Sequence, residues 1–206
     1  MAFGPLQIRF DERVLRPRPW TLEQARWAAE LSDGVPDGAV AELCAGVGHI
    51  GLALAAAVPR ELVLVDTDLR ACELARANAE AAGLTDRVDV RTGEVDATLR
   101  PEERFALMLA DPPWVRSDGT DEFPDDPVGA IDGGDDGLDL ARTCLRVISQ
   151  HLGQGGVAIL QLGDGKQSRA VADHLDRHPE LGLRVADVRN PDANGVLVLL
   201  RGRDSL

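Results

Sequence analysis

The sequence predicts a doubly wound α/β fold, in which one mostly parallel sheet carries helices on both of its faces. Short apolar segments alternate along the 206 residues with longer segments of helical periodicity, as in successive β-α-β units. A glycine turn follows the first apolar segment and an acid ends the second, which is where folds of this class bind ligands. The length fits a single domain, 1–206, whose N-terminal segment and first helix occupy 1–33.

The first half of the chain contains three expected helices. The first begins with Thr21 and Gln24 at the spacing of a capping box, in which two side chains satisfy free N–H groups at a helix start. The third is rich in alanine and is bounded by Asp68, a favoured N-cap residue, and by Gly83, which favours a helix end. The helices expected here are 22–31, 49–57 and 69–82, and the strands are 39–43, 61–65, 87–91 and 105–110.

The second half resumes the alternation after an irregular stretch. The segment 117–139 is rich in Asp, Gly and Pro and has no hydrophobic periodicity, so a loop is expected there. Residues 190–195, Asn-Pro-Asp-Ala-Asn-Gly, suit the turn of a hairpin, so the last strand is expected to run antiparallel to the others. The remaining helices are expected at 138–152 and 168–177, and the strands at 157–162, 183–188 and 196–200.

Composition and charge argue against several classes of protein. The net charge is −13 and Lys166 is the only lysine, whereas proteins that bind nucleic acid cluster Lys and Arg against its phosphates. Arg13, Arg16 and Arg18 form either a local basic patch or a solvated charged segment. No stretch approaches the ~20 apolar residues that cross a bilayer, and residues 1–10 do not resemble an export signal. The three separated cysteines fit a reduced compartment, so a cytoplasmic protein without metal is expected.

A glycine loop between the first expected strand and the second helix is the candidate cofactor site. Gly46 and Gly48 allow a tight turn and a close approach of backbone to ligand, because neither has a Cβ. With Gly51 they also match the dinucleotide fingerprint, and Asp66, eighteen residues after Gly48, would then bind the ribose of NAD. Glu42 favours S-adenosylmethionine (SAM) instead, because a negative charge there would not help to hold a pyrophosphate. NAD remains the alternative ligand.

With SAM as the ligand, acidic residues at the strand ends acquire roles. Asp66 should accept hydrogen bonds from both ribose hydroxyls, and its alternative role is that of an N-cap. Glu94 would approach the adenine amino group, with an ordinary surface position as the alternative, and Val95 would pack on the adenine face. The expected cofactor-binding residues are Glu42, Cys44, Ala45, Gly46, Val47, Gly48, Asp66, Thr67, Glu94, Val95 and Asp111.

The candidate catalytic motif is Asp111-Pro112-Pro113-Trp114, at the exit of the strand 105–110. Two prolines there end the strand ladder and restrict the backbone, because each lacks an N–H and has a locked φ. The Asp111 carboxylate and the Pro112 carbonyl could accept the two N–H groups of an amide or amino nitrogen, which would aim its lone pair at a sulfonium methyl. Trp114 offers a flat face and a cation–π contact as charge develops on that nitrogen. No separate base is required, since the proton can leave after transfer.

These motifs together resemble the HemK-like release-factor glutamine N5-methyltransferases over nearly the whole chain. The glycine loop 42–48, the ribose site 65–66 and the N-terminal stretch 14–19 are similar to their counterparts in that family. Residues 130–139, Ala-Ile-Asp-Gly-Gly-Asp-Asp-Gly-Leu-Asp, resemble the stretch that follows the family's catalytic motif. The resemblance implies a class I SAM-dependent methyltransferase: a Rossmann-like, mostly parallel seven-stranded sheet with an antiparallel terminal strand. It also implies an N-methyltransferase whose acceptor is a protein glutamine or a small molecule.

Two features depart from the family pattern. Asp111-Pro112-Pro113-Trp114 stands where the family has Asn-Pro-Pro-Tyr and is similar to the version in some adenine N6-methyltransferases. The family's N-terminal helical domain, implicated in recognising the protein substrate, has no counterpart in residues 1–21. Two alternatives therefore stay open: a SAM-binding module that needs a partner subunit for activity, and an adenine or nucleotide N-methyltransferase. A partner subunit or a homo-oligomer is among the partners considered.

Two weaker sequence patterns can be explained either structurally or functionally. Nine acidic residues and no basic ones occur between Asp118 and Asp139, which indicates either a solvated loop or a lid that attracts a cationic substrate. His174 and His178 share a helix face, and with no third ligand in view they are interpreted as a surface pair rather than a metal site.

Overall fold

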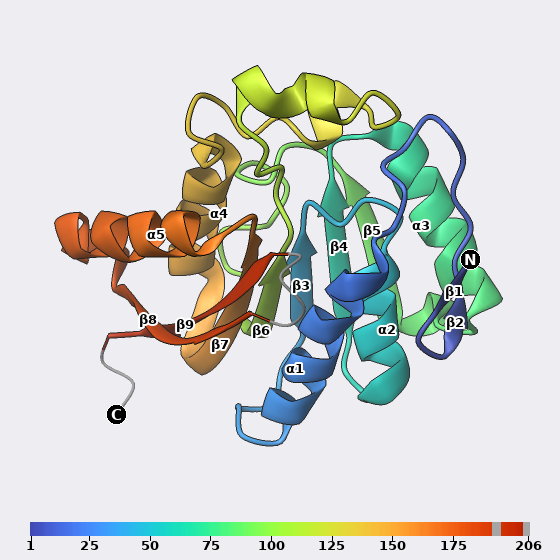
Figure 1. Ribbon diagram of the computed structural model, residues 1–206. Coiled ribbons are helices and arrows are strands. Elements are labelled where there is room, and N and C mark those ends of the chain that lie inside the picture. The colour runs from blue at the N-terminus through green and yellow to red at the C-terminus, as the bar shows by residue number, and fades with distance from the viewer. Residues whose placement is uncertain (191–194, 204–206) are drawn as a thin grey trace.

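A seven-stranded sheet runs through the middle of the molecule (Figure 1). The structure is a computed structural model that describes residues 1–190 and 195–203. The order of the strands across the sheet is β5-β4-β3-β6-β7-β9-β8. These strands are β3 (Val40–Leu43), β4 (Leu62–Asp66), β5 (Val88–Thr92), β6 (Phe105–Ala110), β7 (Leu152–Leu162), β8 (Leu183–Arg189) and β9 (Val196–Gly202).

The pairing of the strands agrees with the predicted topology. Neighbours from β5 to β7 pair in parallel, and β9 runs antiparallel to both β7 and β8. The antiparallel last strand is therefore confirmed, while residues 191–194 of the predicted hairpin turn lie outside the described residues. The chain order reverses between β3 and β6, and such a switch point opens a crevice at the carboxyl ends of the strands.

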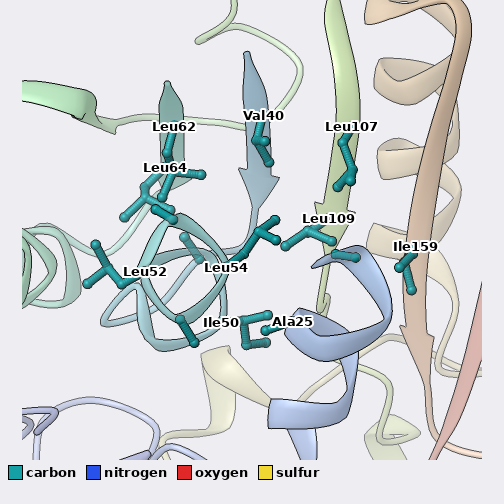
Figure 2. Packing of buried hydrophobic residues seen from close by; sticks show 14 of the residues in the cluster. Ala25, Val40, Ile50, Leu52, Leu54, Leu62, Leu64, Leu107, Leu109 and Ile159 are labelled. Carbon is teal, nitrogen blue, oxygen red and sulfur yellow. The ribbon is translucent and has the colours of Figure 1, made fainter. Parts of the chain in front are cut away.

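Helices cover both faces of the sheet and divide the core in two. The helices are α1 (Leu22–Ser32), α2 (His49–Ala57), α3 (Leu69–Ala81), α4 (Asp139–His151) and α5 (Gly165–Arg177). Residues of α1, α2 and α3 pack with Leu107 and Leu109, as Figure 2 shows for part of this cluster, whereas α4 and α5 pack with Met108 and Ala110. Successive residues of β6 thus enter opposite cores, as the two-residue period of a strand requires. Among the described residues, no helix combines the length and the apolar character needed to cross a membrane.

Most predicted elements are present, with differences at their ends. Asp68 caps α3 as predicted, because its side chain accepts the backbone N–H groups of Arg70 and Ala71. Helix α5 begins at Gly165, earlier than predicted, because Asp164 accepts two backbone N–H groups in the same way. Strand β7 begins at Leu152, earlier than predicted, and its register against β6 shifts between Leu152 and Val157. A short hairpin, β1 (Ala2–Phe3) and β2 (Leu6–Gln7), was not predicted.

The predicted capping box at the start of α1 is wrong. Thr21 has helical backbone angles, φ −69° and ψ −9°, and its hydroxyl donates to the carbonyl of Arg18 at 2.9 Å. Gln24 is completely buried, and its Nε2 donates to the carbonyls of Ala110 at 3.1 Å and Ile159 at 2.9 Å. Because α1 lies across β6 and β7, Gln24 hydrogen-bonds strand carbonyls instead of the first turn of its own helix.

Candidate active site

Two cavities open at the carboxyl ends of the central strands and meet at Asp111. The first has a volume of about 370 Å³ and is lined by the glycine loop between β3 and α2, so we call it the loop cavity. The second, of about 360 Å³, is lined by the residues that follow β6, and we call it the motif cavity. Both volumes lie within the range of about 300–1,000 Å³ typical of small-molecule sites. The residues that line both cavities are Leu15, Arg18, Asp111, Pro113 and Ala130.

Most of the residues predicted to bind a cofactor line the loop cavity. Asp66 ends β4, and its two carboxylate oxygens accept the backbone N–H of Gly46 at 2.6 Å and that of Asp68 at 2.9 Å. Each oxygen retains a further lone pair for a ligand hydroxyl, and burial raises the pKa of this carboxyl. The predicted residues found in this wall are Cys44, Ala45, Gly46, Val47, Asp66, Thr67, Glu94, Val95 and Asp111.

Glu42 and Gly48 are predicted to contact the cofactor, but neither lines the loop cavity. Glu42 is 1% exposed beneath the loop, where its Oε2 accepts the N–H of Gly51 at 2.8 Å and burial raises the pKa of its carboxyl well above the usual range. Gly48 lies inside the turn at φ +77°, and a Cβ there would approach Leu64 Cδ1 to 2.8 Å. Both residues therefore support the conformation of the glycine loop and form no part of the cavity wall.

The surface of the glycine loop leaves room for a ligand. Gly46 lines the cavity at φ +53°, and a Cβ built there would meet no atom within 4 Å. Cys44 is the one non-glycine residue of the described chain with a positive φ, +58°, so the strand exit turns sharply at this point. Its Sγ lies 3.9 Å from that of Cys144 on α4. A small side chain such as that of Cys44 suits this tight strand exit.

His49, the first residue of α2, lines the loop cavity although it is not among the residues predicted to bind the cofactor. Its Nε2 lies 3.1 Å from the Thr21 hydroxyl, whose own hydrogen is donated to Arg18. Nε2 therefore carries the ring proton and donates, and Nδ1 is an acceptor with no partner in the described part of the chain. Burial lowers the pKa of His49 to about 3, so the imidazole is neutral at physiological pH.

The predicted catalytic motif forms much of the motif cavity. Pro112, Pro113 and Trp114 all line it, together with the aromatic rings of Trp20 and Phe123. Asp111 lies at the junction, and burial raises the pKa of its carboxyl from 3.8 to about 7. A carboxyl with that pKa can exchange its proton near neutral pH, and it faces both cavities at once.

Glycines in the stretch 130–139 allow it to lie directly on the catalytic motif. A Cβ at Gly133 would approach the carbonyl oxygen of Pro113 to 2.7 Å, and one at Gly137 would approach that of Trp114 to 2.4 Å. Val115 donates to the carbonyl of Ile131 at 3.0 Å and accepts from the N–H of Gly133 at 2.7 Å. Glycine is therefore required at these two positions because a Cβ would clash with the motif backbone, and the sequence pattern alone does not reveal this.

The acidic segment 118–139 forms part of the walls of both cavities, so it is more than a solvated loop. It contains two short 3₁₀ turns, η3 (Ser117–Glu122) and η4 (Val128–Ala130). Asp126 forms an ion pair with Arg18 from the N-terminal segment, and both side chains line the motif cavity. Arg18 is therefore neutralised rather than part of a free basic patch.

No group of three or more His, Cys, Asp or Glu side chains in residues 1–190 and 195–203 is arranged to hold a metal ion. The rings of His174 and His178 lie 4.4 Å apart, and His178 contacts Glu180 at 2.8 Å.

Comparisons with known proteins place these features among methyltransferases. The model of the family "Methyltransferase small domain" matches residues 28–123, which include the glycine loop, Asp66 and the motif 111–114. The chain is 32% identical over 173 residues to the release factor glutamine methyltransferase of Rhodopirellula baltica, which covers 78% of this chain and 57% of that protein. It is 35% identical over 175 residues to the ribosomal protein uL3 glutamine methyltransferase of Bradyrhizobium diazoefficiens, with coverages of 79% and 54%. The chain thus spans little more than half the length of these relatives.

Solved structures show that the fold is shared. The ribosomal protein L11 methylase from Lactobacillus delbrueckii subsp. bulgaricus aligns with a TM-score of 0.66 over 95% of this chain and 84% of that chain, at 16% identity. The predicted fold class, that of the class I methyltransferases, is therefore confirmed. The dinucleotide interpretation of the glycine loop is set aside, because the methyltransferase model covers that loop.

Proposed function

We propose that this chain belongs to the HemK-like methyltransferase family and that it transfers a methyl group from SAM to a planar amide or amino nitrogen. The observation that supports this proposal most directly is the position of Asp111. Because two cavities of similar volume meet at this carboxyl, one group can contact a donor in the loop cavity and an acceptor in the motif cavity. Such a junction suits direct group transfer between two bound molecules.

The loop cavity has the donor groups and the space that SAM requires. When bound, SAM supplies a methyl group on a positively charged sulfur. Asp66 keeps free lone pairs for the ribose hydroxyls, Glu94 is exposed at the cavity wall for the adenine amino group, and Val95 offers an apolar face. The open space in front of Gly46 allows the ligand to approach the backbone closely. Asp111, Asp66 and Glu94 also make this wall acidic, which favours a cation.

In the motif cavity, the chain's own groups orient the acceptor nitrogen. The carboxylate of Asp111 accepts one N–H and the carbonyl of Pro112 accepts the other, so the nitrogen lone pair faces the loop cavity. As positive charge develops on nitrogen, the Asp111 carboxylate and the face of Trp114 stabilise it. The flat rings of Trp20 and Phe123 complete a cavity suited to a planar group.

Protein glutamine is the acceptor class that we propose first. The two relatives are named for the glutamines of a release factor and of ribosomal protein uL3, whose side chain is a planar amide. A small-molecule amide or amine is the second choice, while the net charge of −13 argues against a nucleic-acid backbone. A partner subunit that recognises the substrate belongs to the same proposal.

Incubation of the purified protein with methyl-labelled SAM and a host lysate tests this function. Label is expected in the protein fraction, rather than in nucleic acid or small molecules. A ligand-binding control accompanies it: S-adenosylhomocysteine should raise the melting temperature and NAD should not. Stabilisation by NAD would contradict the choice of cofactor. Binding of S-adenosylhomocysteine without label in any fraction would instead support a module that needs a partner subunit.

The rate of methyl transfer is expected to rise with pH through about 7. The pKa of Asp111 is raised from 3.8 to about 7, so below neutrality the carboxyl is protonated and cannot accept an N–H with full charge. The folded protein then holds a proton that the unfolded chain has lost, so this group's contribution to stability falls as pH rises from about 4 to 7. A profile of kcat/KM against pH checks the prediction. In Asp111→Asn, which carries the family's neutral amide, the inflection should vanish; its persistence would assign the titration to another group.

A further inference from the structure

We propose that Gln24 and Gln167 clamp the two ends of the Asp111–Trp114 segment and act as positioning residues for methyl transfer. The inference rests on the proposed function, because the group that they position is Asp111. Gln24 belongs to α1 and Gln167 to α5, and these helices lie on opposite faces of the sheet. Neither residue touches the reacting groups in this arrangement, so each acts through the backbone of the motif.

Gln24 holds the strand end that immediately precedes Asp111. Its Nε2 donates to the carbonyl of Ala110 on β6 and to that of Ile159 on β7, and it does so where Ala110 and Leu160 form the last paired residues of these strands. The side chain is fully buried, and its Oε1 has no partner among the described residues. A buried acceptor without a partner costs free energy, and the two hydrogen bonds from Nε2 offset that cost. The two hydrogen bonds from Nε2 are what a glutamine adds.

Gln167 holds the other end of the segment. Its Nε2 donates to the carbonyl of Trp114 at 2.9 Å, and its Oε1 accepts the N–H of Gly163 at 2.8 Å. A Cβ at Gly163 would approach Trp114 Cε3 to 2.5 Å, so the backbone of Gly163 packs directly against the indole. The carbonyl and the ring of Trp114 are therefore both fixed from the turn between β7 and α5.

The motif needs an external clamp because its own backbone offers few donors. Pro112 and Pro113 have no N–H, so the middle of the segment cannot be tied to the sheet by backbone donation. The N–H of Asp111 reaches the carbonyl of Leu43 only at 3.4 Å. Hydrogen bonds from Gln24 and Gln167 to the flanking carbonyls therefore help to fix the backbone on either side of the prolines, and a displacement of about 1 Å can cost 10²-fold in rate.

Near-isosteric variants test the clamp. Gln24→Met and Gln167→Met remove the amides at similar volume, and Gln150→Met, at an exposed site on α4, is the control. Each clamp variant is expected to lower kcat about 10- to 100-fold, with KM changed less than about threefold and S-adenosylhomocysteine binding retained. A residue with a purely structural role would lower the melting temperature without changing kcat. If the wild type is active and both variants keep its kcat, the clamp is overturned and the proposed function stands.

Two spectroscopic measurements on the protein itself test the clamp even if no acceptor is methylated. With 5-fluorotryptophan, the ¹⁹F resonance of Trp114, assigned by Trp114→Phe, is expected to shift or broaden in Gln167→Met and to stay unchanged in Gln150→Met. Amide exchange at Asp111 is expected to quicken at least tenfold in Gln24→Met. An unchanged resonance together with unchanged exchange would overturn the clamp, whereas failure of the wild type to transfer methyl would count against the proposed function alone.

Discussion

Replacing Asp111 with alanine is expected to lower kcat for methyl transfer by about 10²–10³-fold, which is the effect of removing one preorganised hydrogen-bonding group from a site where charge develops. The carboxyl is the group at which the loop cavity and the motif cavity meet, so its loss removes both the orientation of the nitrogen and the stabilisation of its charge. Burial penalises the charged form of Asp111, as its raised pKa of about 7 shows. The variant should therefore melt at the same temperature as the wild type or at a higher one.

Single-turnover measurements with saturating SAM, together with melting curves, check this prediction. Asp111→Asn is the informative companion, since it keeps an acceptor oxygen and should retain far more activity than the alanine variant. Asp37→Ala, an exposed site near the opposite end of β3, should leave kcat unchanged and serves as the control. Normal turnover in Asp111→Ala would remove this residue from the mechanism.

Replacing Asp66 with alanine is expected to weaken the binding of S-adenosylhomocysteine at least about 100-fold. Hydrogen bonds to a charged group contribute about 1.5–3 kcal/mol each, and two ribose hydroxyls would lose such a partner. The variant also loses the bonds from Asp66 to the N–H groups of Gly46 and Asp68, so the glycine loop becomes less well ordered. Both effects act in the same direction on affinity.

Titration calorimetry and melting curves with S-adenosylhomocysteine measure the effect. A concentration of 100 times the wild-type Kd stabilises the wild type by about 2.7 kcal/mol, and a 100-fold weaker variant by only about 0.4 kcal/mol. Asp66→Asn keeps the size of the side chain and should fall between the two. If Asp66→Ala bound S-adenosylhomocysteine as tightly as the wild type, the ribose would have to be held elsewhere.

Much of the fold follows from signals that lie close together in the sequence. The apolar strand 105–110 and the helix 49–57 have the predicted bounds, because hydrophobic periodicity reflects burial directly. Asp68 caps α3 as predicted, since an N-cap bonds to N–H groups only two and three residues away. The same local logic brings Asp66 and Asp111 to the carboxyl edge of the sheet, because Asp66 ends one parallel strand and Asp111 follows another.

Local logic fails where a side chain bonds to a distant segment. Gln24 has the spacing of a capping box, but it binds Ile159, 135 residues away, because α1 packs across β6 and β7. Glu42 has the sequence position of a cofactor ligand, but its carboxylate turns beneath the loop to Gly51. Gln167 gives no sequence signal at all, since its partner Trp114 is 53 residues away.

The sequence by itself therefore determined that a sheet forms, that its strands are mostly parallel, and which residues make up the motif. Periodicity, capping and strand exits are short-range effects that a linear pattern records. Only the tertiary structure decided that two cavities meet at Asp111 and that Arg18 pairs with Asp126 in the wall of the motif cavity. Those features depend on which helix packs against which strand end. That choice is a global balance of apolar burial and satisfied hydrogen bonds, and no short window of sequence contains it.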